Sequence, residues 1–422
     1  MNIFKETESE VQSYARSFPR VFHRAQGEHV FDEEGNSYLD FLAGAGALNY
    51  GHNNALLKEK LLAYIADDGI THGLDMHSRA KAEFLEALRD KILARRGLDY
   101  RVQFTGPTGT NAVELALKLA RKVTGRRNIV AFTNGFHGMT MGALSCTGNS
   151  GKRKGAGGQP LCGTTHMPYE HAFGSDMDSL RVIRQMLANG SSGMDAPAAF
   201  IIEPVQGEGG LNAASTEFLQ GVAALAKEYG ALLIVDDIQS GCGRTGTFFS
   251  FEEMGIEPDL IPMAKSFSGM GLPFAALLIK REHDIWKPAE HNGTFRGNTH
   301  AFVTARIALE KFWKDDTFQK AINAKAEILE TALKRITEIV PGSRLKGRGM
   351  MRGVDVGSGD LAEKICARAF EKGLVIETSG ADDEVVKVLA PLTTPEDMFQ
   401  KGLDILVEAV KDVAETHKVA AE

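Results

Sequence analysis

The stretch ALLIVDDIQSG, residues 231–241, combines a strand pattern with two adjacent carboxylates. Residues 231–235 are apolar and partly β-branched, which is typical of a strand buried inside a parallel sheet. Asp236 and Asp237 follow at the carboxyl end of this strand, where open α/β sheets place their ligands. Buried carboxylates are costly unless a positive group faces them. We therefore expect at least one of the two to meet a cation in a binding site.

Four further apolar runs surround this strand in the sequence and alternate with helical segments. They are YRVQFTG (100–106), NIVAFTN (128–134), AAFIIEPV (198–205) and FAALLIK (274–280). Between them, segments such as NAVELALKLARKV carry the apolar stripe of an amphipathic helix. This alternation predicts an α/β fold with a largely parallel sheet.

Long amphipathic helical patterns begin near residue 306 and are followed by a glycine-punctuated α+β stretch and a final helical segment. We therefore expect a large domain over residues 50–305 and a smaller α+β C-terminal domain over residues 306–422. Residues 1–49 contain the hairpin pattern HVFDEEGNSYLDF. We expect this N-terminal segment to pack with the small domain.

The composition argues against several classes of protein. Of the 422 residues, 43% are hydrophobic and 24% are charged, and the formal net charge is -7. That balance gives no reason to expect nucleic acid or an anionic membrane surface as a partner. The four cysteines lie far apart and form no metal-ligand pattern, as suits a reducing compartment. Because the sequence has no apolar signal core and no apolar run of membrane-spanning length, we predict a cytoplasmic protein without a metal site.

A glycine-rich turn with two hydroxyls, TGPTGT (105–110), precedes the helical segment after the first strand. Free backbone N–H groups at a helix start, beside the hydroxyls of Thr108 and Thr110, suit a phosphate group. The alternative is that Thr110 or Asn111 only caps the helix. The turn by itself leaves both interpretations open.

Residues 241–246, GCGRTG, match the G-x-G-x-x-G pattern of dinucleotide-binding proteins. That pattern requires the glycines to open a helix directly after a strand. Here DDIQS intervenes and the aromatic segment TFFSF follows, so a dinucleotide site is disfavoured. The sequence also contains no G-x-x-x-x-G-K-[ST] and no HExxH, so it gives no support for a P-loop nucleotide triphosphatase or a zinc protease of the HExxH type.

Lys265 is the candidate cation for the strand-end carboxylate. It follows an apolar run in DLIPMAKSFSGMG and is enclosed by small residues. Desolvation would lower the pKa of its ammonium, and a neutral amine can bond covalently to an aldehyde. The alternative is an edge lysine that reaches solvent. A strand-end carboxylate, a downstream lysine and a phosphate turn are together the parts that a pyridoxal phosphate enzyme needs.

Seven motifs resemble, in order, those of the class III aminotransferases of fold type I, which use pyridoxal 5'-phosphate. They lie between residues 105 and 393 and read TGPTGTNAVE, NGFHGMT, IIEPVQGEGG, VDDIQSGCGRTG, MAKS, GTFRGN and VLAPLT. The resemblance implies a large domain whose mostly parallel sheet is flanked by helices, plus a smaller α+β domain. It also implies a homo-oligomer with active sites at the dimer interface, where Thr294 of GTFRGN reaches the phosphate of the neighbouring subunit.

The resemblance assigns roles to particular positions of this sequence. It implies that Lys265 binds the cofactor aldehyde and that Asp236 pairs with the pyridinium nitrogen, so these two are the predicted catalytic residues. Phe136 and Ile238 would contact the two faces of the ring, and Gln239 would lie near the ring hydroxyl. The full set of cofactor-binding residues implied is Gly109, Thr110, Phe136, His137, Glu203, Asp236, Ile238, Gln239, Lys265 and Thr294.

Substrate recognition is expected to differ from that of many relatives, which hold a substrate carboxylate with two arginines. Met139 and Lys387 occupy those positions here. A lysine attracts a carboxylate as a point charge, without the planar fork of arginine. Glu208, which matches the family's switch glutamate, would pair with Lys387 when a dicarboxylate is absent. Glu208 and Lys387 are therefore the predicted substrate-binding residues.

The stretches FLAGAGALNYGHNN (41–54) and GITHGLDMHSRAK (69–81) resemble the diaminobutyrate-forming branch of this family. That resemblance implies transfer of the amino group of L-glutamate to L-aspartate 4-semialdehyde with ping-pong kinetics, giving L-2,4-diaminobutyrate and 2-oxoglutarate, as in ectoine biosynthesis. The alternative is another class III ω-aminotransferase, acting on ornithine, acetylornithine or 4-aminobutyrate. A racemase or aminomutase of the same fold is a further interpretation. A cofactor-binding regulator is disfavoured, because no basic recognition helix precedes the core.

Overall fold

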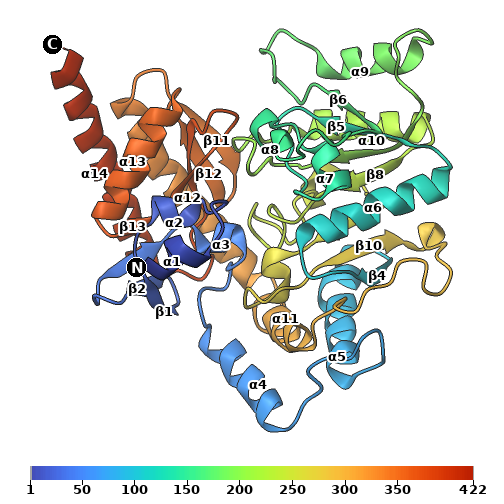
Figure 1. Ribbon diagram of the computed structural model, residues 1–422, viewed down its shortest axis with the longest axis horizontal. Coiled ribbons are helices and arrows are strands. Elements are labelled where there is room, and N and C mark those ends of the chain that lie inside the picture. The colour runs from blue at the N-terminus through green and yellow to red at the C-terminus, as the bar shows by residue number, and fades with distance from the viewer. Residues whose placement is uncertain (1, 422) are drawn as a thin grey trace.

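The computed structural model describes residues 2–421, so Met1 and Glu422, at the ends of the predicted segments, lie outside the described residues. A seven-stranded sheet forms the centre of the larger lobe (Figure 1). All five apolar runs of the sequence form strands of this sheet. In spatial order its strands are β4 Tyr100–Phe104, β10 Ala276–Lys280, β9 Leu260–Met263, β8 Leu232–Val235, β7 Pro197–Ile202, β5 Asn128–Phe132 and β6 Thr164–Met167.

The sheet is largely parallel, as predicted. Strands β6, β5, β7, β8 and β9 pair in parallel, whereas β10 runs antiparallel to both β9 and β4. A parallel connection needs a long crossover, usually a helix. Only the short 3-10 helix Lys265–Ser268 and a loop connect β9 to β10, and the chain therefore returns antiparallel.

Helices cover both faces of this sheet, and alternate side chains of each strand point toward opposite layers of helices. Ile129 of β5 packs in one hydrophobic cluster with α6 Gly109–Thr124, and the next residue, Val130, packs in another with α10 Thr216–Glu228. Alternation of this kind explains why β7, β8 and all of β5 after Asn128 are apolar. The other helices beside this sheet are α7 Met141–Cys146, α8 Ser150–Lys154 and α9 Ser179–Ala188.

Two smaller sheets lie in the second lobe. One is antiparallel and contains β11 Arg344–Arg348, β12 Met351–Asp355, β15 Val385–Val388 and β14 Glu377–Ser379. The other joins the N-terminal strands β1 Phe22–Gln26, β2 His29–Asp32 and β3 Ser37–Asp40 to β13 Leu374–Val375. Figure 1 accordingly places the blue N-terminal strands beside the red and orange C-terminal elements. The exact domain boundaries stay a prediction.

The remaining helices pack around these sheets. The small lobe contains α12 Thr317–Ile339, α13 Gly359–Glu371 and α14 Glu396–Ala421, and α1 Asn2–Thr7, α2 Tyr14–Ser17 and α3 Ala43–Gly46 lie near the N-terminus. The lower part of Figure 1 holds α4 Ala55–Ala66, α5 Arg79–Ala87 and α11 Thr299–Phe312. Within residues 2–421, no helix combines the length and apolarity needed to cross a membrane.

Candidate active site

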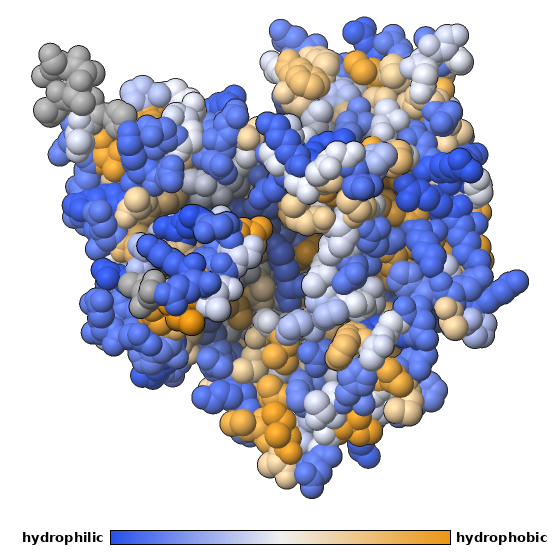
Figure 2. Space-filling model, viewed as in Figure 1, coloured by the Kyte–Doolittle hydropathy of each residue, from blue (hydrophilic) through white to orange (hydrophobic). Residues whose placement is uncertain are grey.

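A cavity of about 500 Å³ lies where β4, β5, β7, β8 and β9 end, and Figure 2 shows the surface hollowed between the two lobes. Five loops from separate parts of the chain meet there because parallel strands bring their carboxyl ends to one edge of the sheet. All the predicted cofactor-binding residues except Thr294 line this cavity. They are Gly109, Thr110, Phe136, His137, Glu203, Asp236, Ile238, Gln239 and Lys265, and the predicted substrate residue Glu208 lies with them.

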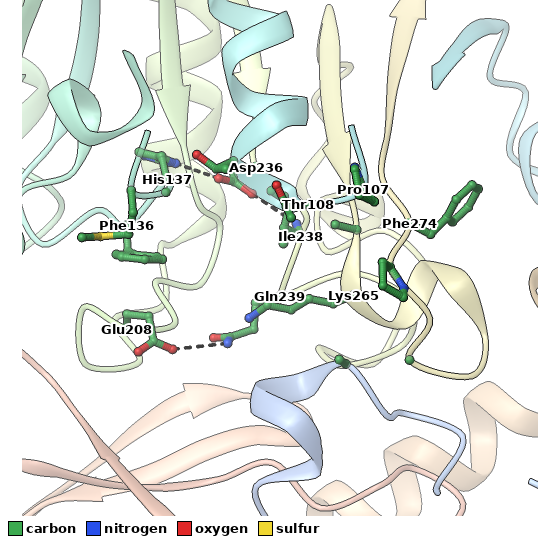
Figure 3. Close-up of a pocket in the computed structure, with 18 of the residues that line it drawn as sticks. Pro107, Thr108, Phe136, His137, Glu208, Asp236, Ile238, Gln239, Lys265 and Phe274 are labelled. Carbon is green, nitrogen blue, oxygen red and sulfur yellow. Dashed lines mark hydrogen bonds and ion pairs between the residues drawn. The ribbon is translucent and has the colours of Figure 1, made fainter. Parts of the chain in front are cut away.

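Asp236 faces the cavity from the end of β8 and is held by three hydrogen bonds. Its backbone N–H donates to Ile202 O at 2.9 Å, and its Oδ1 accepts from Ile238 N at 3.2 Å. Its Oδ2 lies 2.7 Å from Nδ1 of His137, and both side chains are buried (Figure 3). Burial disfavours the imidazolium, but the hydrogen bond and charge of Asp236 outweigh burial and raise the pKa of His137. The pair thus fixes the direction of the Asp236 carboxylate.

Asp237 points away from the cavity and makes its hydrogen bonds inside the protein. Its carboxylate accepts hydrogen bonds from Ser240 Oγ at 2.9 Å and from Ser250 N at 3.2 Å. Burial raises the pKa of this carboxyl to about 6. Successive residues of an extended chain point to opposite sides, so one of the two adjacent carboxylates faces the site and the other does not.

Lys265 follows β9 by two residues and extends into the cavity. Its backbone lies in the left-handed region, with φ of 52°, a conformation that costs a non-glycine residue on the order of 1 kcal/mol or more. Its Nζ donates to Ala45 O at 2.9 Å, and burial lowers the pKa of its ammonium. The alternative that Lys265 is an edge lysine reaching solvent is wrong. The lowered pKa favours the neutral, nucleophilic amine.

The start of α6 presents unpaired backbone donors to the cavity. The helix N-cap is Thr108, so the alternative that Thr110 or Asn111 caps the helix is wrong. Instead, Asn111 Nδ2 donates to Thr108 Oγ1 at 2.8 Å, and Thr110 Oγ1 lies 2.7 Å from Thr140 Oγ1. Across the described part of the chain, no acceptor is recorded for the N–H groups of Gly109 and Thr110. These donors at the positive end of a 16-residue helix suit a phosphate.

Phe136 and Ile238 lie on opposite sides of the cavity and leave an open slot between them (Figure 3). Glycine at position 109 keeps this slot open, since a Cβ there would lie 3.0 Å from Ile238 Cδ1. Glu203 holds the loop that carries the ring of Phe136, because its Oε1 accepts from Phe136 N at 2.8 Å. Burial raises the pKa of Glu203 despite the nearby charge of His137.

Glu208 and Lys387 form the ion pair that the sequence predicted, at 2.9 Å. The Lys387 side chain on β15 is fully buried, and a second carboxylate, Glu377 on β14, lies 2.8 Å from the same ammonium. Burial opposes ionisation of Glu208, but the ammonium groups of Lys387 and Lys265 outweigh burial and lower the pKa of its carboxyl to about 2. Tyr14 donates its hydroxyl to Glu377 Oε2 at 3.1 Å. Sequence reasoning missed both Glu377 and Tyr14.

Two further residues singled out in the sequence lie at or beyond the rim. Met139, which stands at a position where many relatives have arginine, lines the cavity and is 51% exposed. Thr294 is exposed and is absent from the cavity wall of its own chain. The structure therefore brings together every predicted site residue except Thr294 in one chain, with Lys387 directly behind Glu208.

The profile of the family described as aminotransferase class-III matches residues 11–410. The chain belongs to the class III aminotransferases. Among curated relatives of this aminotransferase, the diaminobutyrate--2-oxoglutarate transaminase of Vibrio cholerae serotype O1 is 58% identical and covers 96% of this chain and 98% of its own. The protein of the same name from Halomonas elongata is 53% identical and covers 97% and 98%.

Solved structures agree with this fold. The ornithine aminotransferase from Toxoplasma gondii superposes on this aminotransferase with a TM-score of 0.85 at 25% identity, covering 99% of this chain and 95% of its own. A transaminase from the marine bacterium Virgibacillus gives a TM-score of 0.87 at 19% identity, with 98% of each chain covered. The prediction of an α/β fold of type I is therefore confirmed.

Pyridoxal 5'-phosphate is the cofactor of this family and of this aminotransferase. The cavity fits it in three independent respects. The unpaired N–H groups of α6 match a phosphate, and the slot between Phe136 and Ile238 matches a flat ring. Gln239 Nε2 donates to Ala45 O at 3.0 Å, whereas its buried Oε1 has no hydrogen-bond partner among the described residues. That orphaned acceptor matches a ring hydroxyl.

Proposed function

We propose that this aminotransferase moves the amino group of L-glutamate to L-aspartate 4-semialdehyde, producing L-2,4-diaminobutyrate and 2-oxoglutarate. The observation that carries the proposal is identity above 50% over nearly the whole chain with several relatives named diaminobutyrate--2-oxoglutarate transaminase. In this proposal the reaction serves ectoine biosynthesis in the cytoplasm.

Pyridoxal phosphate, when bound, withdraws electrons from the substrate carbon that bears the transferred amine and carries the amino group between the two substrates. Asp236 would keep a proton on the ring nitrogen, because its carboxylate faces the cavity and is held in place by His137. Lys265 Nζ would bind the aldehyde carbon and, once released, move a proton at the substrate carbon. The lowered pKa of Lys265 supports this role, since a protonated amine can neither attack nor accept a proton.

The remaining cofactor contacts follow from the cavity wall. Gly109 and Thr110 would donate backbone hydrogen bonds to the phosphate, and Gln239 Oε1 would meet the ring hydroxyl. Phe136 and Ile238 would enclose the ring from its two faces. His137 and Glu203 would act indirectly: His137 would orient Asp236, and Glu203 would orient Phe136.

Both substrates would use the same cavity in turn, which predicts ping-pong kinetics. Glutamate carries a distal carboxylate, whereas the semialdehyde is shorter and carries an α-amino acid end. Glu208 lines the cavity in front of the buried Lys387. Movement of Glu208 would expose the Lys387 ammonium to a carboxylate of either substrate: the side-chain carboxylate of glutamate, or the carboxylate at the α-amino acid end of the semialdehyde.

The functional unit in this proposal is at least a dimer. Thr294 lies on an exposed segment outside the cavity of its own chain, where a second copy can receive it. Apolar side chains gather on the lower face formed by α4 and the residues after it (Figure 2). Exposed large apolar residues of this region and of the Thr294 segment are Leu62, Ile65, Ile70, Leu74, Met76 and Phe295. An exposed apolar patch of this kind indicates a protein interface.

A coupled assay tests the proposal. The purified protein is supplied with pyridoxal phosphate, glutamate and one of three aldehydes: aspartate 4-semialdehyde, succinate semialdehyde or glutamate 5-semialdehyde. We expect 2-oxoglutarate release to be fastest with aspartate 4-semialdehyde, and Lys265→Ala to abolish it. Preference for either of the other two aldehydes would favour a different ω-aminotransferase. Conversion of substrate without 2-oxoglutarate release would indicate a racemase or aminomutase.

A further inference from the structure

The cluster behind the cavity contains two carboxylates for one cation. Lys387 Nζ lies 2.9 Å from Glu208 and 2.8 Å from Glu377, and its side chain is fully buried. With both carboxylates ionised, these three side chains carry a net charge of -1. If Lys387 served only to bind substrate carboxylates, one carboxylate that can move away would be enough to cover it. The second carboxylate, Glu377, therefore requires an explanation.

The two carboxylates differ in how they are held. Glu377 on β14 is the direct antiparallel partner of Lys387 on β15, so the sheet register fixes this pair. Tyr14 from α2 also donates to Glu377. Glu208, in contrast, sits on the loop after β7 of the seven-stranded sheet and lines the cavity. Glu208 can therefore leave Lys387, whereas Glu377 stays with it.

This difference changes what the cavity attracts. When Glu208 turns away from Lys387, Glu377 still neutralises the ammonium, and the displaced Glu208 carboxylate remains at the cavity wall. The cluster then offers a cation and a carboxylate side by side while its net charge stays negative. A simple carboxylate gains only the attraction of the ammonium and is repelled by Glu208, whereas a substrate end with both charges gains from both groups.

We infer that Glu377 sets the preference of this cavity for a substrate end that carries both an ammonium and a carboxylate. The inference rests on the proposed function and deepens it. The α-carbon end of L-2,4-diaminobutyrate has this form: its carboxylate would face Lys387 and its ammonium would face Glu208. The same four-carbon chain without the α-ammonium is 4-aminobutyrate. Glu377 is thus a specificity-determining residue that acts through Lys387 and does not touch the substrate.

Glu377→Gln tests this inference with little change in shape. The amide oxygen of glutamine can still accept from Lys387 at the position of Oε1, and its NH2 group can donate to the Tyr14 hydroxyl oxygen at the position of Oε2. Folding should therefore be retained, which thermal unfolding checks. Each protein is assayed with 2-oxoglutarate and either L-2,4-diaminobutyrate or 4-aminobutyrate as amino donor. The ratio of kcat/KM for the two donors is the readout, because a structural defect lowers both values together.

We expect Glu377→Gln to reduce the preference for diaminobutyrate by about tenfold, the scale of one unit charge acting across a partly buried site. Glu377→Asp, which keeps the charge, should retain most of the preference. Glu330→Gln is the matched control, since Glu330 pairs with Arg352 and Lys334 on the same lobe but does not line the cavity. It should leave the ratio unchanged.

The outcomes separate this inference from the proposed function. A parent enzyme that prefers 4-aminobutyrate overturns the proposed function whatever the variants do. A parent that prefers diaminobutyrate supports it. In that case an unchanged ratio in Glu377→Gln, or an equal loss with both donors, overturns the role of Glu377 alone.

Discussion

Replacement of Lys387 by methionine tests the buried ion cluster most severely. The substitution keeps an unbranched side chain that is one atom shorter, but removes the ammonium that lies 2.9 and 2.8 Å from Glu208 and Glu377. Two carboxylates would then face each other at the edge of the cavity without the ammonium that pairs with both. Removing one partner of a buried ion pair costs about 3–5 kcal/mol. At the usual unfolding entropy per residue, that cost lowers Tm by roughly 3–6 °C for a chain of this length.

The pH dependence of this variant has a defined sign. Without Lys387, burial and mutual repulsion raise the pKa of Glu208 and Glu377 in the folded state above their values in the unfolded chain. A carboxyl with a raised folded pKa destabilises the protein above its unfolded pKa, and the penalty is relieved as pH falls. In the parent the pKa of Glu208 is about 2, so its stabilising effect is constant between pH 7 and pH 5, whereas burial already raises the pKa of Glu377. Removing Lys387 raises both pKa values further. The Tm difference between variant and parent should therefore shrink over this interval.

The assay is thermal unfolding of the cofactor-free proteins at pH 7 and pH 5. Lys325→Met is the matched control, because Lys325 donates to a carbonyl, Leu392 O, at 2.7 Å and has no carboxylate within 4 Å among the described residues. It should cost less and show no recovery at pH 5. Adding Glu377→Gln to Lys387→Met should restore part of the lost stability. A Lys387→Met protein as stable as the parent at both pH values would refute the reasoning.

Two further predictions concern the cofactor side of the cavity. Gly109→Ala should weaken pyridoxal phosphate binding by about tenfold or more, because the new Cβ would lie 3.0 Å from Ile238 Cδ1 and narrow the ring slot. Fluorescence titration of the cofactor-free protein measures this affinity. An unchanged affinity would contradict the claim that the ring lies between Phe136 and Ile238. The pKa of His137 is raised in the folded state, so its stabilising effect is complete below about pH 6.5 and is lost as pH rises through the folded pKa. His137→Gln should therefore lose less stability than the parent between pH 6 and pH 9 in thermal unfolding, and parallel curves would contradict an imidazolium at this position.

The elements that could be predicted from sequence are those whose cause is local. The apolar runs around 128–132, 197–202, 232–235 and 276–280 form strands because they are buried on both faces, whereas 100–104 forms the half-buried edge strand β4. The direction of β10 could not be predicted, since it depends on the missing crossover helix between β9 and β10. The N-cap of α6 is Thr108, two or three residues before the alternatives Thr110 and Asn111. The sequence could not decide between them, because hydroxyl and amide side chains at 108, 110 and 111 all suit a helix start.

The site divides in the same way. Asp236 and Lys265 could be singled out because each is a charged residue at the end of an apolar strand, and the pairing of Glu208 with Lys387 followed from family resemblance. Glu377 required the exact register of β14 on β15, which a short strand pattern does not fix. Tyr14 required the packing of the N-terminal segment against the opposite end of the chain, a contact between residues 363 positions apart. Neither contact has a local signature.

The attachment point of the cofactor is the most direct test of the account. The protein loaded with pyridoxal phosphate is treated with borohydride, which makes the link between the cofactor and a lysine permanent, and the labelled peptide is identified by mass spectrometry. Label on Lys265 is the predicted result, with Asp236→Asn protein retaining less cofactor before reduction. Label on a different lysine, or a protein that takes up no cofactor, would contradict the claim that Lys265 and Asp236 hold the two ends of one ring.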